Sequence, residues 1–220
     1  PGGGPMPEKN AYAMPSAREI AALTVPQLGM MLCHLSISMT DLWVAGRLGA
    51  DVQASIGIVS QVFTLLMLVA SLAGSGCLAA ISQSLGAGLG RRARRYAALI
   101  VGMAGMTGLA AAALGLLSLP LTLRFMHVPP PLEPVVRTFI IAYSCQLPFY
   151  YTLIMFNSVF RAYKLVRLPL IAIAVVAVGN LIGSAGFGLG LCGLPDYGYQ
   201  GIAWSTFGSA LLGLACNLYA

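Results

Sequence analysis

The chain has 220 residues, of which 58% are hydrophobic and 8% are charged, and its formal net charge is +6. A soluble domain carries about 25% charged residues, so this composition excludes a water-facing globular surface and fits a protein dissolved in a bilayer. The basic residues lie in short tracts between apolar segments, which is typical of membrane topology signals and argues against a nucleic-acid-binding protein.

Six segments are long and apolar enough to span a membrane, which takes about 20 residues. They cover approximately residues 20–44, 54–78, 96–119, 135–160, 168–191 and 201–220. Residues 1–19 precede them, are rich in turn-forming residues, and are expected to be a flexible cytoplasmic tail. We therefore predict an all-α membrane protein in which residues 20–220 form one six-helix transmembrane lobe.

The distribution of basic residues predicts the orientation. If the N-terminus is cytoplasmic, three basic residues fall outside the cell: Arg47, Arg124 and Arg137. The other nine fall inside: Lys9, Arg18, Arg91, Arg92, Arg94, Arg95, Arg161, Lys164 and Arg167. The positive-inside rule therefore favours a multi-pass protein of the inner (plasma) membrane with its N-terminus in the cytoplasm.

The first span carries a polar stripe. Gln27, His34 and Asp41 are seven residues apart and Ser38 lies four beyond His34, so all four share one helical face. We regard Gln27, His34 and Ser38 as candidates for lining a substrate cavity. Pro26 removes one backbone hydrogen bond from the same helix and is a candidate hinge.

Asp41 has two interpretations. In one, the span ends near Asp41 and the carboxylate lies at the outer interface beside Trp43. In the other, the helix continues to about Leu48 and Asp41 faces a cavity, where it binds a proton or a cation. A carboxylate at the membrane centre costs about 2.5–3.5 kcal/mol on insertion scales, and a bound proton or cation removes that cost. His34 is likewise either a helix–helix hydrogen-bond donor or a proton relay.

Later spans add polar residues. Tyr143 and Asn157 in the fourth span are further cavity candidates. Asn180 and Ser184 in the fifth span are four residues apart and share a face, and Thr206 lies in the sixth. Taken alone, the fifth- and sixth-span residues are typical of polar contacts between transmembrane helices.

Four short segments, in chain order, carry a family resemblance. Residues 41–49 (DLWVAGRLG) resemble the end of the first helix in transporters of the MATE (multidrug and toxic compound extrusion) family. Residues 83–88 (QSLGAG) resemble the end of the second helix, and residues 157–162 (NSVFRA) the exit of the fourth. Residues 198–206 (GYQGIAWST) resemble the entry into the sixth helix.

The resemblance implies a twelve-helix, two-lobe transporter of which this chain is the N-terminal lobe. Such a protein is a secondary active exporter of cationic or amphipathic organic compounds, in antiport with protons or sodium by alternating access. It is not an enzyme and needs no cofactor besides the coupling ion. Its partners would be the lipid bilayer, small organic cations and the second lobe, with no role for nucleic acid.

The resemblance also implies a cation-coupling cluster. Asp41, Asn180 and Thr206 match the family positions, whereas Ser184 replaces a carboxylate or amide. Sodium binding at Asp41, Asn180 and Thr206 is therefore possible, but there is no firm metal site, because Asp41 is the only carboxylate.

Two alternatives stay open. A lipid-linked sugar flippase of the same superfamily has a cavity lined with basic residues, and Arg161 and Arg167 are here expected at helix ends. A half-size transporter would instead work as a homodimer. The last span reaches Ala220 without a basic flank, so we expect the natural protein to continue into a second lobe.

Overall fold

The computed structural model describes residues 16–125 and 127–219, so most of the predicted tail lies outside the described residues. The described part is helical, with elements α1 (Ala17–Leu48), α2 (Ala50–Gly86), α3 (Gly90–Leu117), α4 (Leu119–Phe125), α5 (Glu133–Ala162), α6 (Arg167–Leu189), the 3₁₀ turn η1 (Leu191–Gly193) and α7 (Tyr199–Tyr219). All the α-helices except α4 are long and apolar enough to cross a bilayer. This confirms the predicted all-α architecture with six spans.

The spanning helices begin before the apolar segments seen in the sequence, and α1 shows why. Ser16 and Glu19 form a capping box, in which the Ser16 hydroxyl accepts from the Glu19 backbone N–H at 3.3 Å and the Ser16 N–H donates to Glu19 Oε2 at 2.9 Å. The helix therefore begins at Ala17, before the apolar stretch. Hydropathy identifies only the part of a helix that lies in lipid, whereas capping and backbone hydrogen bonds set its ends.

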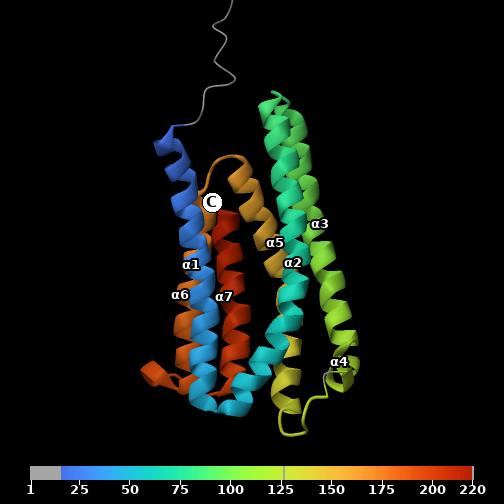
Figure 1. The fold of residues 1–220 in the computed structure, drawn as a ribbon, viewed down its shortest axis with the longest axis vertical. Coiled ribbons are helices and arrows are strands. Elements are labelled where there is room, and N and C mark those ends of the chain that lie inside the picture. Colours follow the sequence, from blue (N-terminus) through green and yellow to red (C-terminus); the bar gives the residue numbers. More distant parts are fainter. Residues whose placement is uncertain (1–15, 126, 220) are drawn as a thin grey trace, which may run out of the picture.

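Figure 1 shows two packed groups of helices. On one side, α1 packs against α6 and α6 against α7; on the other, α2 and α3 both pack against α5. Contact between α5 and α7 joins the groups, while α1 and α2 touch much less. Small residues allow the closest crossings, as at Gly108 of α3, where a Cβ atom would lie 2.5 Å from the Cα atom of Pro148 in α5.

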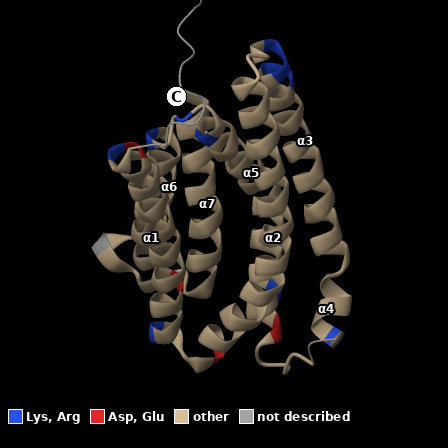
Figure 2. Ribbon diagram, turned by 45° about the horizontal axis from the view of Figure 1, so that its top comes forward, with Lys and Arg blue, Asp and Glu red and all other residues tan. Residues whose placement is uncertain are grey.

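The two ends of the bundle differ in charge (Figure 2). One end holds the start of α1, the α2–α3 turn and the α5–α6 turn, with basic residues Arg18, Arg91, Arg92, Arg94, Arg95, Arg161, Lys164 and Arg167. We call this the basic end. The opposite end carries Arg47, Arg124 and Arg137 together with the acidic residues Asp51, Glu133 and Asp196. Among the described residues, Glu19 is the only carboxylate at the basic end.

Candidate functional site

The structure brings Asp41, Asn180, Ser184 and Thr206 into one buried cluster. Asp41 Oδ1 accepts hydrogen bonds from Asn180 Nδ2 at 3.1 Å and from the Ser184 hydroxyl at 2.9 Å, and Asp41 Oδ2 accepts from the Thr206 hydroxyl at 3.2 Å. Asp41 is 5% exposed and Asn180 and Ser184 are fully buried. Three helices, α1, α6 and α7, thus converge on one carboxylate.

The course of α1 and the burial of Asp41 agree with the structural part of the second interpretation, in which the helix continues to about Leu48 and Asp41 faces inward. Helix α1 continues past it to Leu48, and a break follows at Gly49, whose φ of 136° belongs to the region that favours glycine. Trp43 is 48% exposed on the outer surface of α1, whereas Asp41 faces the interior. The carboxylate is therefore an internal group of the helix bundle.

Every partner of Asp41 can reverse its hydrogen-bonding role. A hydroxyl both donates and accepts, and a side-chain amide presents its oxygen when it rotates by half a turn. The buried Asn180 Oδ1 has no hydrogen-bond partner among the described residues. This oxygen can therefore accept a hydrogen bond if the amide rotates toward a protonated Asp41. The cluster can accordingly satisfy either an ionised carboxylate, which only accepts, or a carboxylic acid, which must also donate.

A chamber of about 280 Å³ opens beside this cluster, and we call it the Asp41 chamber. Asp41 and Thr206 lie in its wall, together with the predicted cavity residues His34, Ser38 and Tyr143. Asn180 and Ser184 do not line the chamber. They donate hydrogen bonds to the Asp41 carboxylate without lining the chamber themselves. Phe63 packs edge-on against Tyr143, with ring centroids 5.0 Å apart, and gives the chamber an aromatic side.

A second chamber, of about 450 Å³, lies toward the basic end, and we call it the Arg161 chamber. It contains the remaining predicted cavity residues, Gln27 and Asn157, and shares His34, Met67 and Tyr150 with the Asp41 chamber. The Tyr150 hydroxyl contacts His34 Nδ1 at 3.4 Å where the two chambers meet. All five predicted cavity residues therefore line this pair of neighbouring chambers.

Sequence reasoning missed several wall residues, although a signal was present. Tyr150 lies seven residues after Tyr143 and seven before Asn157, which repeats on α5 the seven-residue spacing of the α1 stripe. Residues at this spacing share a helical face, so α5 presents a matching polar stripe across the cavity. Arg161, four residues after Asn157, continues that stripe and was placed by sequence only at a helix end.

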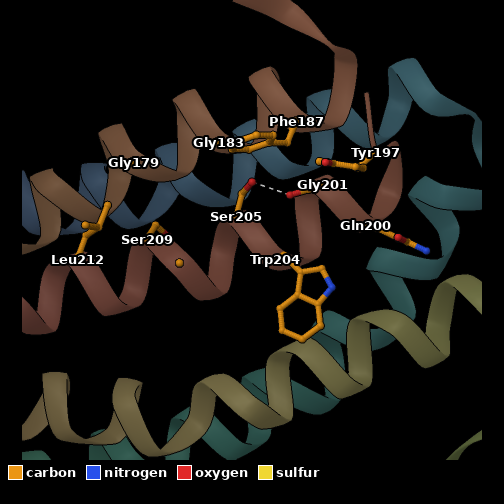
Figure 3. Close-up of a pocket in the computed structure, with 11 residues that line it drawn as sticks. Gly179, Gly183, Phe187, Tyr197, Gln200, Gly201, Trp204, Ser205, Ser209 and Leu212 are labelled. Carbon is orange, nitrogen blue, oxygen red and sulfur yellow. Dashed lines mark hydrogen bonds between the residues drawn. The ribbon is translucent and has the colours of Figure 1, made fainter. Parts of the chain in front are cut away.

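Another groove, of about 650 Å³, lies along α6 and α7. Figure 3 shows Phe187, Ser205, Ser209 and Leu212 between the two helices, with the Trp204 indole projecting away from them. The described residues that line it carry no charge, and only Ser209 also lines the Asp41 chamber. We therefore assign the candidate site to the two neighbouring chambers that share His34 and that contain Asp41 and Arg161, respectively.

Comparison with known proteins assigns the family. The sequence model of the MatE family matches residues 26–185, a region that contains α1 from its proline to most of α6 and hence Asp41, Asn180 and Ser184. The chain belongs to the MatE family. MatE proteins are transporters and not enzymes, and they need no cofactor.

Two curated relatives illustrate the match. The chain is 28% identical to a probable multidrug resistance protein NorM of Chromobacterium violaceum over 209 residues, which cover 89% of this chain and 42% of the relative. It is 31% identical to the protein of the same description from Pseudomonas aeruginosa over 192 residues, covering 86% and 38%. The chain thus spans less than half the length of these relatives.

Solved structures share the fold. A MATE family transporter of the MOP superfamily in an outward-facing conformation superimposes with a TM-score of 0.84 at 18% identity, covering 91% of this chain and 44% of that one. The Vibrio cholerae MATE transporter VcmN in its bent form gives a TM-score of 0.81 at 23% identity, covering 90% and 44%. The six-helix bundle therefore corresponds to one lobe of MATE transporters.

Proposed function

We propose that this chain is the N-terminal lobe of a multidrug exporter that exchanges cationic or amphipathic organic compounds for protons by alternating access. The observation that carries the proposal is the single buried carboxylate of Asp41, held by three helices at the edge of a chamber. The multidrug resistance relatives support the export function. The partners we propose are the bilayer, small organic cations and a second lobe.

Exchange at one carboxylate is sufficient to couple the two fluxes. When Asp41 is ionised in a water-poor site, it requires a positive charge nearby, which an organic cation in the chamber supplies. When a proton binds, the carboxyl group becomes neutral and donates to Ser184, Thr206 or a rotated Asn180 amide. The cation then loses its counter-charge and is released, so proton and drug compete for one group.

The oxygen ligands available around Asp41 favour a proton over sodium as the coupling ion. Sodium would need several oxygen ligands, and the cluster offers the carboxylate, two hydroxyls and the Asn180 oxygen only after its amide rotates. With Ser184 in place of a second acid, a bound cation would be held by one negative charge.

Alternating access requires a helix that can bend, and α1 has a weak point at Pro26. Proline lacks the N–H that would bond to the carbonyl four residues earlier, so the helix is less constrained there. Pro26 precedes Gln27, which lines the Arg161 chamber. Along α1, Pro26 is therefore closer to the basic end of the bundle than Asp41 is. We propose that α1 bends at Pro26 between two states of the transport cycle.

The test is Asp41→Asn in the natural full-length protein, measured as ethidium efflux from cells. The amide keeps the size of the side chain but cannot ionise, so efflux should fall by roughly tenfold or more. Asp51→Asn is the matched control, because Asp51 is an exposed carboxylate in the first turn of α2 and should be replaceable without loss. Normal efflux by a folded Asp41→Asn protein would refute the proposed role.

A further inference from the structure

A separate pocket lies on α3 close to the α2–α3 turn, and we call it the Arg95 pocket. Its volume is about 550 Å³, and its described walls consist of Leu89, Arg91, Arg92, Arg95, Tyr96 and Leu99. The members from Arg91 onward are spaced by one, three, one and three residues along α3, so they share one helical face. The pocket shares no described wall residue with the Asp41 chamber or the Arg161 chamber.

The positive charge of the Arg95 pocket is not neutralised within the described part of the chain. The single ion pair in residues 16–125 and 127–219 joins Arg137 to Glu133 at the other end of the bundle. The only described carboxylate at the basic end is that of Glu19, which accepts from the Ser16 N–H in the capping box of α1. Figure 2 shows the arginines gathered at the tip of α2 and α3. An anion is therefore the complementary ligand.

Two features orient the donors of this pocket. The Arg92 guanidinium donates from Nε and Nη2 to the Tyr96 hydroxyl at 3.0 and 2.9 Å and lies over the Tyr96 ring, 5.3 Å from its centroid. Its remaining N–H groups can bind a ligand. Helix α3, which is described in full, also begins without a side-chain cap and without an acidic residue in its first turn. The free N–H groups there carry the positive end of the helix dipole and add to the attraction of the guanidinium groups for an anion.

Apolar side chains continue from the pocket along the same face of α3. Leu99 lines the pocket, and Met103 and Met106 follow four and seven residues later; all three are exposed. Helix α3 is long and apolar enough to span a membrane, so this stripe faces acyl chains while the arginines lie at the headgroups. A basic pocket that continues into an apolar stripe matches a phospholipid better than a soluble anion.

The four arginines of this tract divide between two faces of α3. Arg91, Arg92 and Arg95 line the pocket, whereas Arg94 is exposed and does not line it. A tract that only set the topology would need positive charge on any face of the helix. The three arginines that share one face with an aromatic ring therefore indicate a binding site in addition to a topology signal.

We propose that the Arg95 pocket binds the phosphate of an anionic phospholipid in the leaflet at the basic end, with an acyl chain along Leu99 and Met103. A guanidinium donates two parallel hydrogen bonds to a phosphate, and basic tracts beside a spanning helix attract anionic headgroups. The inference is independent of the proposed export function, because it requires only that α3 spans a bilayer.

The test is a titration of the purified, delipidated full-length protein with dioleoylphosphatidylglycerol, followed by native mass spectrometry. The wild type should bind the first phosphatidylglycerol about tenfold more tightly than dioleoylphosphatidylcholine, which is zwitterionic. Arg95→Gln should weaken phosphatidylglycerol binding by about tenfold, the loss of charge-assisted hydrogen bonds. Arg94→Gln is the matched control: it removes the same charge from the same turn and should change the affinity by less than about twofold. Salt of about 0.2 M screens charges more than about 8 Å apart, which limits the long-range effect of either change.

Three outcomes would overturn the proposal. Equal weakening by Arg95→Gln and Arg94→Gln would show that only the total charge of the tract matters. Equal affinity of the wild type for the two lipids would show that the pocket does not select an anionic headgroup. Displacement of phosphatidylglycerol by glycerol 3-phosphate at the same concentration would assign the pocket to a soluble phosphate. If Arg95→Gln does not insert stably, Arg95→Lys decides: it keeps the charge but loses the paired hydrogen bonds, so the affinity should fall by about threefold, and an unchanged affinity overturns the assignment.

Discussion

Replacing Ser184 with aspartate should convert the Asp41 cluster into a sodium-dependent site. The Ser184 hydroxyl lies 2.9 Å from Asp41 Oδ1, so a carboxylate at position 184 would lie next to the first one. Two unit charges about 4 Å apart repel by about 4 kcal/mol at an effective dielectric constant near 20. The pair therefore needs a proton or a cation between its oxygens, and at pH 8 sodium is the available partner.

The assay is thermal unfolding of the purified full-length protein at pH 8 in sodium chloride and in choline chloride. If sodium offsets about half of the repulsion, or about 2 kcal/mol, the melting temperature of Ser184→Asp should rise by roughly 4 °C in sodium relative to choline. The neutral Ser184→Asn protein and the wild type should show no such difference. A Ser184→Asp protein that is folded but equally stable in both salts would refute the placement of position 184 beside Asp41.

Two further predictions concern packing and orientation. Gly108→Ala should destabilise the protein by about 1–3 kcal/mol in an SDS titration, because the new Cβ would lie 2.5 Å from the Cα of Pro148. The control is Gly102→Ala on the same helix, whose Cβ meets nothing within 4 Å and should cost no stability. Equal stability of the two variants would contradict the α3–α5 contact. Single cysteines at Arg92 and Asp196 should react with membrane-impermeant reagents from the cytoplasm and from outside, respectively, and the reverse pattern would overturn the proposed cytoplasmic N-terminus.

Much of the architecture could be predicted because bilayer and periodicity signals are strong. Apolar runs of about 20 residues identify spans, and a spacing of seven residues identifies the face that carries Gln27, His34 and Asp41. Hydropathy did not give helix ends, because a helix such as α2 continues to Gly86 through residues that are too polar for lipid. The boundary between the tail and the lobe at residue 19 stays a prediction, as does the second lobe after Ala220.

The role of individual side chains was harder to predict, since it depends on how helices are rotated relative to one another. The sequence indicated only that Ser184 replaces a stronger ligand for sodium; it did not predict that the Ser184 hydroxyl makes the shortest hydrogen bond to Asp41. Arg161 was placed at a helix end, and only the packing of α5 against its neighbours shows that it lines a chamber. Such contacts arise between residues far apart in sequence, where a single sequence carries no distance information.

The most direct test of the central claim is the release of protons when ethidium binds to purified full-length protein in weakly buffered detergent solution. If drug and proton compete for Asp41, binding by the protonated wild type should release about one proton per bound cation, as linkage requires. The Asp41→Asn protein should release none at ethidium concentrations that produce the same bound fraction. Equal proton release from the variant and the wild type would contradict the assignment of Asp41 as the coupling residue.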